Sequence, residues 1–203
     1  ASMNFTIFEI SVVTFLLAIS GAIAQWPIGS LSDKFDRRKV IIYTTFGAAF
    51  FALCAIFASR QMYLPGDLGT NKSWFYISLI LFSFCSLPMF AIIFAHTNDF
   101  ISKEKFVAAG AGLQFAFGLG AMSGPFLCSL FMKLIGSNGY FVFLIIFHSL
   151  IGFFAIHRMK VRKTADNPDS QFTAMPQTIT PMGMELNPTT EPIEDPVKTE
   201  TEN

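Results

Sequence analysis

Acidic and basic residues gather between two apolar stretches near the start of the chain, among them Asp33, Lys34, Arg37, Arg38 and Lys39. Carboxylates and guanidinium groups at such close spacing can form ion pairs, and a shielded ion pair can hold two parts of a protein together. Such a charge cluster cannot lie in hydrocarbon. The apolar stretches on either side must therefore return to the same face of a membrane at this point.

Three further polar side chains are candidates for lining a cavity within the membrane: Gln25, His96 and Gln114. A side-chain amide deep in a membrane needs a polar partner or water, which makes the two glutamines the clearer candidates. His96 and Asp99 are three residues apart and so share a helix face. A proton-coupled sensor that uses His96 is the alternative interpretation of that residue.

Five apolar runs must position these residues. A bilayer core of about 30 Å is crossed by about 20 helical residues, and strands are not expected because open sheet edges cannot be satisfied in lipid. The predicted fold is an all-α integral membrane helical bundle over residues 1–163. Its spans lie at about 8–28, 40–58, 74–95, 106–131 and 140–156.

The basic residues predict how the bundle is oriented. Three bases flank the runs on one side, at Arg60, Lys72 and Lys133. The other side carries Lys34, Arg37, Arg38, Lys39, Lys103, Lys105, Arg158, Lys160, Arg162 and Lys163. Because Lys and Arg are enriched in cytoplasmic loops, the Asp33 loop and the C-terminus are expected in the cytoplasm, and the N-terminus outside.

Residues 164–203 differ in character from the rest of the chain. They hold one base against eight acids, whereas residues 1–163 hold 13 bases against 6 acids. They also carry six of the ten prolines and almost no aromatic residues. Such a segment cannot bury enough apolar surface to offset its chain entropy, so we expect a disordered, acidic, Pro- and Thr-rich cytoplasmic tail.

The spacing Gly29-x-x-x-Asp33-Lys34-x-x-Arg37-Arg38 resembles the signature loop of the major facilitator superfamily. The superfamily usually has glycine where this chain has Asp36. The stretch Gln-Trp-Pro-Ile-Gly-x-Leu-Ser-Asp at 25–33 and the run Ala-His-x-Asn-Asp at 95–99 look like the C-terminal half of YcaD-like bacterial facilitators. On that resemblance, the five helices correspond to helices eight to twelve of a twelve-helix transporter, and the chain is a fragment.

The resemblance also implies roles for individual residues. It implies a cytoplasmic gate formed by Gly29, Asp33, Lys34, Arg37, Arg38 and Asp99, in which Arg37 or Arg38 pairs with Asp99. The alternative is that these charges are solvated determinants of topology. The segment Gly120-x-x-x-Gly124-Pro125 resembles a glycine-proline element of the superfamily, and a generic helix-packing seam is the alternative.

The function implied by the resemblance is secondary transport of a small solute by alternating access in a bacterial inner membrane. Its partners would be the solute, the lipid bilayer, the missing N-terminal half and a proton as a coupling ion. No enzyme constellation, cofactor motif, metal site or nucleic-acid stripe is present in the sequence. The alternative function is a self-contained multi-span membrane scaffold or subunit with a docking tail.

Overall fold

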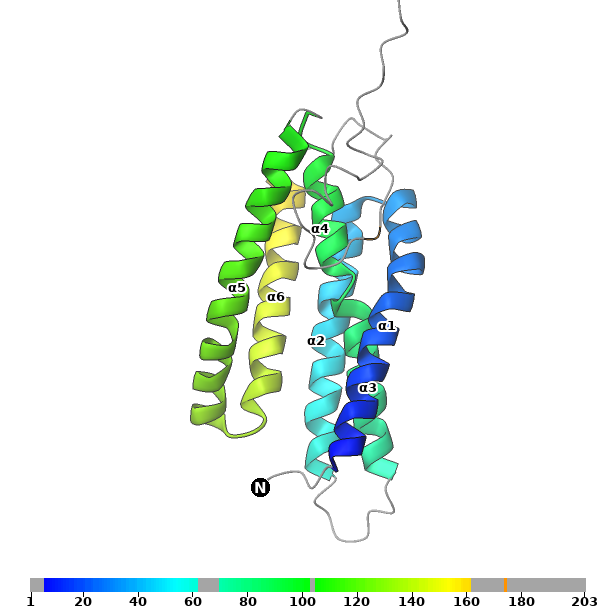
Figure 1. Ribbon diagram of the computed structural model, residues 1–203, viewed down its shortest axis with the longest axis vertical. Coiled ribbons are helices and arrows are strands. Elements are labelled where there is room, and N and C mark those ends of the chain that lie inside the picture. The colour runs from blue at the N-terminus through cyan, green and yellow to red at the C-terminus, as the bar shows by residue number, and fades with distance from the viewer. Residues whose placement is uncertain (1–5, 62–69, 103–104, 162–173, 175–203) are drawn as a thin grey trace, which may run out of the picture.

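The chain folds into a bundle of six helices that lie roughly along one axis (Figure 1). The computed structural model describes residues 6–61, 70–102, 105–161 and 174, and these contain no strand. The helices are α1 (Ile7–Lys34), α2 (Arg37–Gln61), α3 (Thr70–Ser86), α4 (Met89–Asn98), α5 (Phe106–Ile135) and α6 (Gly139–Val161). The predicted all-α fold is confirmed. The predicted acidic tail at 164–203 lies outside the described residues, apart from Ala174.

Five helical segments are long and apolar enough to cross a membrane: Ile7–Lys34, Arg37–Arg60, Lys72–Asn98, Phe106–Ile135 and Gly139–Val161. At 1.5 Å per residue, each exceeds about 30 Å in length. The third segment contains both α3 and α4. Pro88 separates the two helices, because proline has no N–H to donate to the preceding turn. Its φ of −69° and ψ of −14° keep the backbone helical, so the span continues beyond the break.

α2 is the central helix of the bundle and packs along both α3 and α6. Its buried face includes the alanines Ala48, Ala52 and Ala55, which are at most 1 % exposed. Small side chains let neighbouring backbones approach closely, which is how helices commonly associate in membranes. Gly152 of α6 shows this closeness, since an added Cβ there would lie 2.8 Å from the Phe46 ring.

Serine side chains join α1 to α3 within the apolar interior. The Ser20 hydroxyl donates to the Ile80 carbonyl at 2.9 Å, and the Ser83 hydroxyl donates to the Leu17 carbonyl at 2.7 Å. Next to Ser20, α1 lies so close to the segment after α3 that a Cβ at Gly21 would overlap the Leu87 side chain. α1 is therefore fixed to the third span rather than to its sequence neighbour α2, with which it has few contacts.

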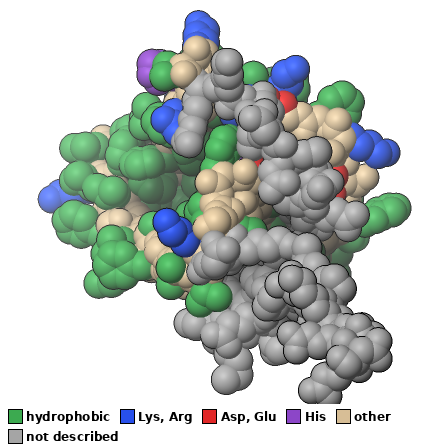
Figure 2. Space-filling model, turned by 90° about the horizontal axis from the view of Figure 1, so that it is seen from above, with side chains coloured by type: hydrophobic (Ala, Val, Ile, Leu, Met, Phe, Trp, Pro, Cys, Tyr) green, Lys and Arg blue, Asp and Glu red, His purple; other side chains and the backbone are tan. Residues whose placement is uncertain are grey.

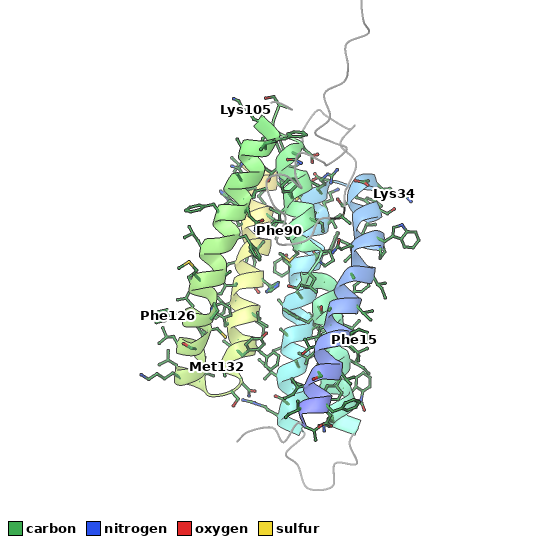
Figure 3. All side chains as sticks on the ribbon, in the orientation of Figure 1. Phe15, Lys34, Phe90, Lys105, Phe126 and Met132 are labelled. Carbon is green, nitrogen blue, oxygen red and sulfur yellow. The ribbon has the colours of Figure 1, made fainter. Side chains whose placement is uncertain are left out.

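The two ends of the bundle differ in charge. We call the charged end the one at which α1, α4 and α6 end and α2 and α5 begin, at the top of Figure 1. Lys34 and Lys105 both lie there, whereas Met132 lies near the opposite end (Figure 3). Seen from the charged end, Lys and Arg side chains are distributed around the rim (Figure 2).

Candidate functional site

The turn between α1 and α2 forms without any unusual backbone conformation. α1 ends at Lys34 and is capped by Phe35, which has an extended backbone and donates its N–H to the Leu31 carbonyl at 3.0 Å. Asp36 then begins α2: its carboxylate accepts the N–H of Arg38 at 3.0 Å, and its carbonyl accepts that of Lys39 at 2.8 Å. Aspartate is among the preferred N-caps. Asp36, which stands where the signature loop of the superfamily usually has glycine, thus caps the start of α2 in this chain.

Arg37 lies at the centre of a buried ion cluster at this turn. Its Nε is 3.1 Å from Oδ2 of Asp99, its Nη2 is 3.2 Å from Oδ1 of Asp33, and its Nη1 donates to the Ser32 hydroxyl at 3.3 Å. The Arg37 and Asp99 side chains are only 8 % and 11 % exposed. We call these four residues the Arg37 cluster. It links the end of α1, the start of α2 and the end of α4.

Arg38 belongs to a separate pair. Its Nε and Nη2 donate to the two carboxylate oxygens of Asp36 at 3.0 and 2.8 Å. This hydrogen bonding to the Arg38 side chain holds the pKa of Asp36 below its ordinary value, against the opposing effect of burial. Of the two arginines expected to reach Asp99, Arg37 makes the pair, and Arg38 fixes the turn.

Two polar neighbours lie beside the Arg37 cluster at the end of α4. His96 Nδ1 is 3.9 Å from Asp99 Oδ2, and the imidazole ring packs edge-on against Phe100 with ring centroids 5.1 Å apart. The Asn98 side chain is buried, and its Oδ1 accepts no hydrogen bond from the described residues.

The structure therefore brings together Asp33, Arg37, Asp99 and His96 of the residues singled out in the sequence. Gly29 is buried within α1, one turn before Asp33, whereas Lys34 is exposed at the end of that helix.

The three cavity candidates do not form one lining in the described chain. Gln25 is half-buried on α1, and Gln114 is half-buried on α5 with its Oε1 shielded and without a hydrogen bond from a described residue. α1 and α5 have no extensive contact with each other. His96 lies at the charged end, beyond both of them along the bundle.

The glycine-proline segment of α5 does not pack against another described helix. A Cβ added at Gly120 or Gly124 would meet nothing within 4 Å, and Pro125 is exposed. α5 touches α6 and, through Phe90 and Phe117, the side of α4, and its apolar stretch contains no buried residue. Phe126 projects away from the bundle on this side (Figure 3).

Sequence reasoning missed one ion pair at the opposite end, where Lys72 Nζ binds the Glu9 carboxylate and joins α3 to α1. Glu9 also closes the capping box of α1 with Thr6. The pair could have been predicted from the sequence, since Glu9 and Lys72 have opposite charge and were expected on the same side of the membrane. Among described residues, no group of three His, Cys, Asp or Glu side chains could hold a metal ion.

Comparison with known proteins assigns the chain to a family. It matches the model of the Major Facilitator Superfamily over residues 1–193. It is 22 % identical over 160 residues to an uncharacterized MFS-type transporter of Yersinia enterocolitica, covering 79 % of this chain and 37 % of that protein. It is 23 % identical over 127 residues to the uncharacterized MFS-type transporter YcaD of Escherichia fergusonii, covering 63 % of this chain and 30 % of that protein.

The chain thus spans about a third of the length of the curated relatives that it matches. No solved structure gives a significant match. The predicted resemblance to MFS-type transporters that include YcaD is confirmed, and the multi-pass arrangement of apolar helices agrees with it. The chain belongs to the Major Facilitator Superfamily and is a multi-pass integral membrane protein.

Proposed function

We propose that this chain supplies helices eight to twelve of a secondary transporter that moves a small solute by alternating access. The family, the five apolar spans and the limited coverage of the relatives support this proposal. The open face of α5 supports it too, because Gly120 and Gly124 would let another helix approach closely. The facing N-terminal half would cover this side, and the central cavity would lie between the halves, with Gln25 and Gln114 on its wall.

The Arg37 cluster would act as a latch on the cytoplasmic side of the bacterial inner membrane. The observation that carries this proposal is that one buried guanidinium binds two carboxylates from different helix ends, Asp33 and Asp99. A rocking half must keep its helix ends together while it moves as a body, and this cluster ties three of them. The excess of basic residues at the charged end supports the cytoplasmic orientation.

Transport assays on the protein expressed from its complete gene would test the proposal. Proteoliposomes are screened for uptake of candidate solutes with and without an imposed pH gradient. Once a solute is found, Arg37→Gln and Asp99→Asn are compared with Lys39→Gln, which removes an exposed base from the same turn. We expect uptake to fall in the first two variants and to persist in the third. Equal uptake in all three, at equal protein levels, would exclude the latch.

A proton is the coupling ion that we propose, with His96 and Asp99 as the candidate carriers in this chain. Their side chains approach to 3.9 Å beside the Arg37 cluster. If the proposal holds, uptake by His96→Gln loses its response to the pH gradient. If uptake by His96→Gln responds to the pH gradient as strongly as uptake by the unaltered protein, another residue carries the proton.

A further inference from the structure

A pocket of about 350 Å³ opens at the charged end, beside the Arg37 cluster but not part of it. It lies between the start of α2, the end of α4 with the residues that follow it, and the last turns of α6. Its lining residues are Arg38, His96, Thr97, Phe100, Ile101 and Arg158. We propose that this pocket binds a phosphate group, carried either by an anionic lipid headgroup or by a soluble phosphate.

The lining has the chemistry of an anion site. Among the described residues that line it, two side chains are guanidinium groups, one is an imidazole and one is a hydroxyl, and none is a carboxylate. Guanidinium groups present planar pairs of N–H donors that match the oxygens of phosphate, and such charge-assisted hydrogen bonds are about twice as strong as neutral ones. Phe100 and Ile101 provide an apolar wall on which a glycerol or acyl segment could lie.

The two arginines contribute differently. Arg38 is held in place by its two hydrogen bonds to Asp36, so its position is set before any ligand arrives. Arg158, in the last turn of α6, has no carboxylate within 4 Å among the described residues. Its charge is therefore the one most available to an incoming anion.

The competing explanation is that Arg158 only marks the cytoplasmic side, as bases at helix ends commonly do. Lys160 separates the two explanations, because it lies two residues further along α6, is exposed and does not line the pocket. If Arg158 had only a topological or diffuse electrostatic role, substituting either base would change the affinity for phosphate equally. If the pocket is a phosphate site, substituting Arg158 lowers that affinity and substituting Lys160 does not.

The test measures thermal stabilisation of the protein, expressed from its complete gene and purified in detergent. A ligand that binds the folded state raises its stability with a saturable dependence on concentration. One arm titrates short-chain phosphatidylglycerol against phosphatidylcholine of equal chain length. The other titrates inorganic phosphate against chloride at equal ionic strength. Saturation by phosphatidylglycerol alone assigns a lipid ligand, and saturation by phosphate that competes with the lipid assigns a soluble one.

Variants identify the site. Because a hydrogen bond to a charged group is lost, we expect Arg158→Gln to weaken the apparent affinity about tenfold or more, and Lys160→Gln to change it by less than about twofold. Ile101→Trp narrows the pocket without altering its charge and should weaken binding, which keeps the test open if Arg158→Gln does not fold. The proposal is overturned if neither ligand stabilises saturably, if Lys160→Gln loses as much affinity as Arg158→Gln, or if folded Ile101→Trp binds normally.

Discussion

Replacing Asp99 by asparagine should destabilise the protein far more than replacing any exposed charge at the same end. The substitution keeps the size of the side chain but leaves Arg37, 8 % exposed, without the carboxylate 3.1 Å from its Nε. Removing one partner of a buried ion pair costs about 3–5 kcal/mol. Since Arg37 retains Asp33, we expect the lower end, about 3 kcal/mol, which is a large share of a total stability of about 5–15 kcal/mol.

The expected cost at Asp33 is smaller. Its carboxylate is 3.2 Å from Arg37 Nη2, but its side chain is 34 % exposed, so solvent screens the pair. Exposed ion pairs are worth about 0–1 kcal/mol, and Asp33→Asn should fall near the upper limit of that range. The two aspartates therefore serve as an internal comparison: they bind the same guanidinium and differ mainly in burial.

The assay is equilibrium unfolding by denaturant in mixed micelles, which gives the free energy of unfolding for each variant. Arg37→Gln, Asp99→Asn and the double variant form a mutant cycle, and coupled neighbours show interaction energies of about 0.5–3 kcal/mol. Lys39→Gln, which removes an exposed base, is the control. The reasoning is refuted if Asp99→Asn costs no more than Lys39→Gln, or if the cycle gives a coupling energy below about 0.5 kcal/mol.

Two further predictions follow from the helix contacts and the turn. Gly21→Ala should destabilise the bundle by about 1–3 kcal/mol, because the new methyl group overlaps Leu87. Gly118→Ala should not, since a Cβ there meets nothing within 4 Å. Unfolding in the same micelles compares the two variants, and an equal loss of stability in both would contradict the packing of α1. Asp36→Asn should be less stable than the unaltered protein near neutral pH but not in acid. Hydrogen bonding to Arg38 depresses the pKa of Asp36 in the folded protein. The contribution of Asp36 to stability is therefore present above its ordinary pKa of 3.8 and is lost as pH falls through the lower pKa of the folded state. Stability curves of the variant and the unaltered protein that stay parallel below pH 3.8 would contradict that assignment.

Hydrophobic pattern alone was enough to predict the helical membrane fold. Runs of about 20 apolar residues have few alternatives in a bilayer, because every backbone group must be satisfied within the segment itself. The pattern also placed the Asp33 turn between spans, since clustered charges are excluded from hydrocarbon. The break at Pro88 within the third span was less apparent, because apolar residues continue on both sides of it.

Only the tertiary structure decided which charges meet. Arg37 and Arg38 are adjacent and chemically identical, and sequence reasoning left both as partners for Asp99. The direction of each side chain from the first turn of α2 separates them, sending Arg37 to Asp99 and Arg38 to the Asp36 cap. The proposed phosphate pocket has the same origin. Arg158 and His96 are far apart in sequence, and the packing of α4 and α6 against α2 brings them to one cavity. Sequence determined the spans through local, one-dimensional hydrophobicity, whereas ion pairs and pockets depend on contacts between distant segments, which a single sequence does not specify.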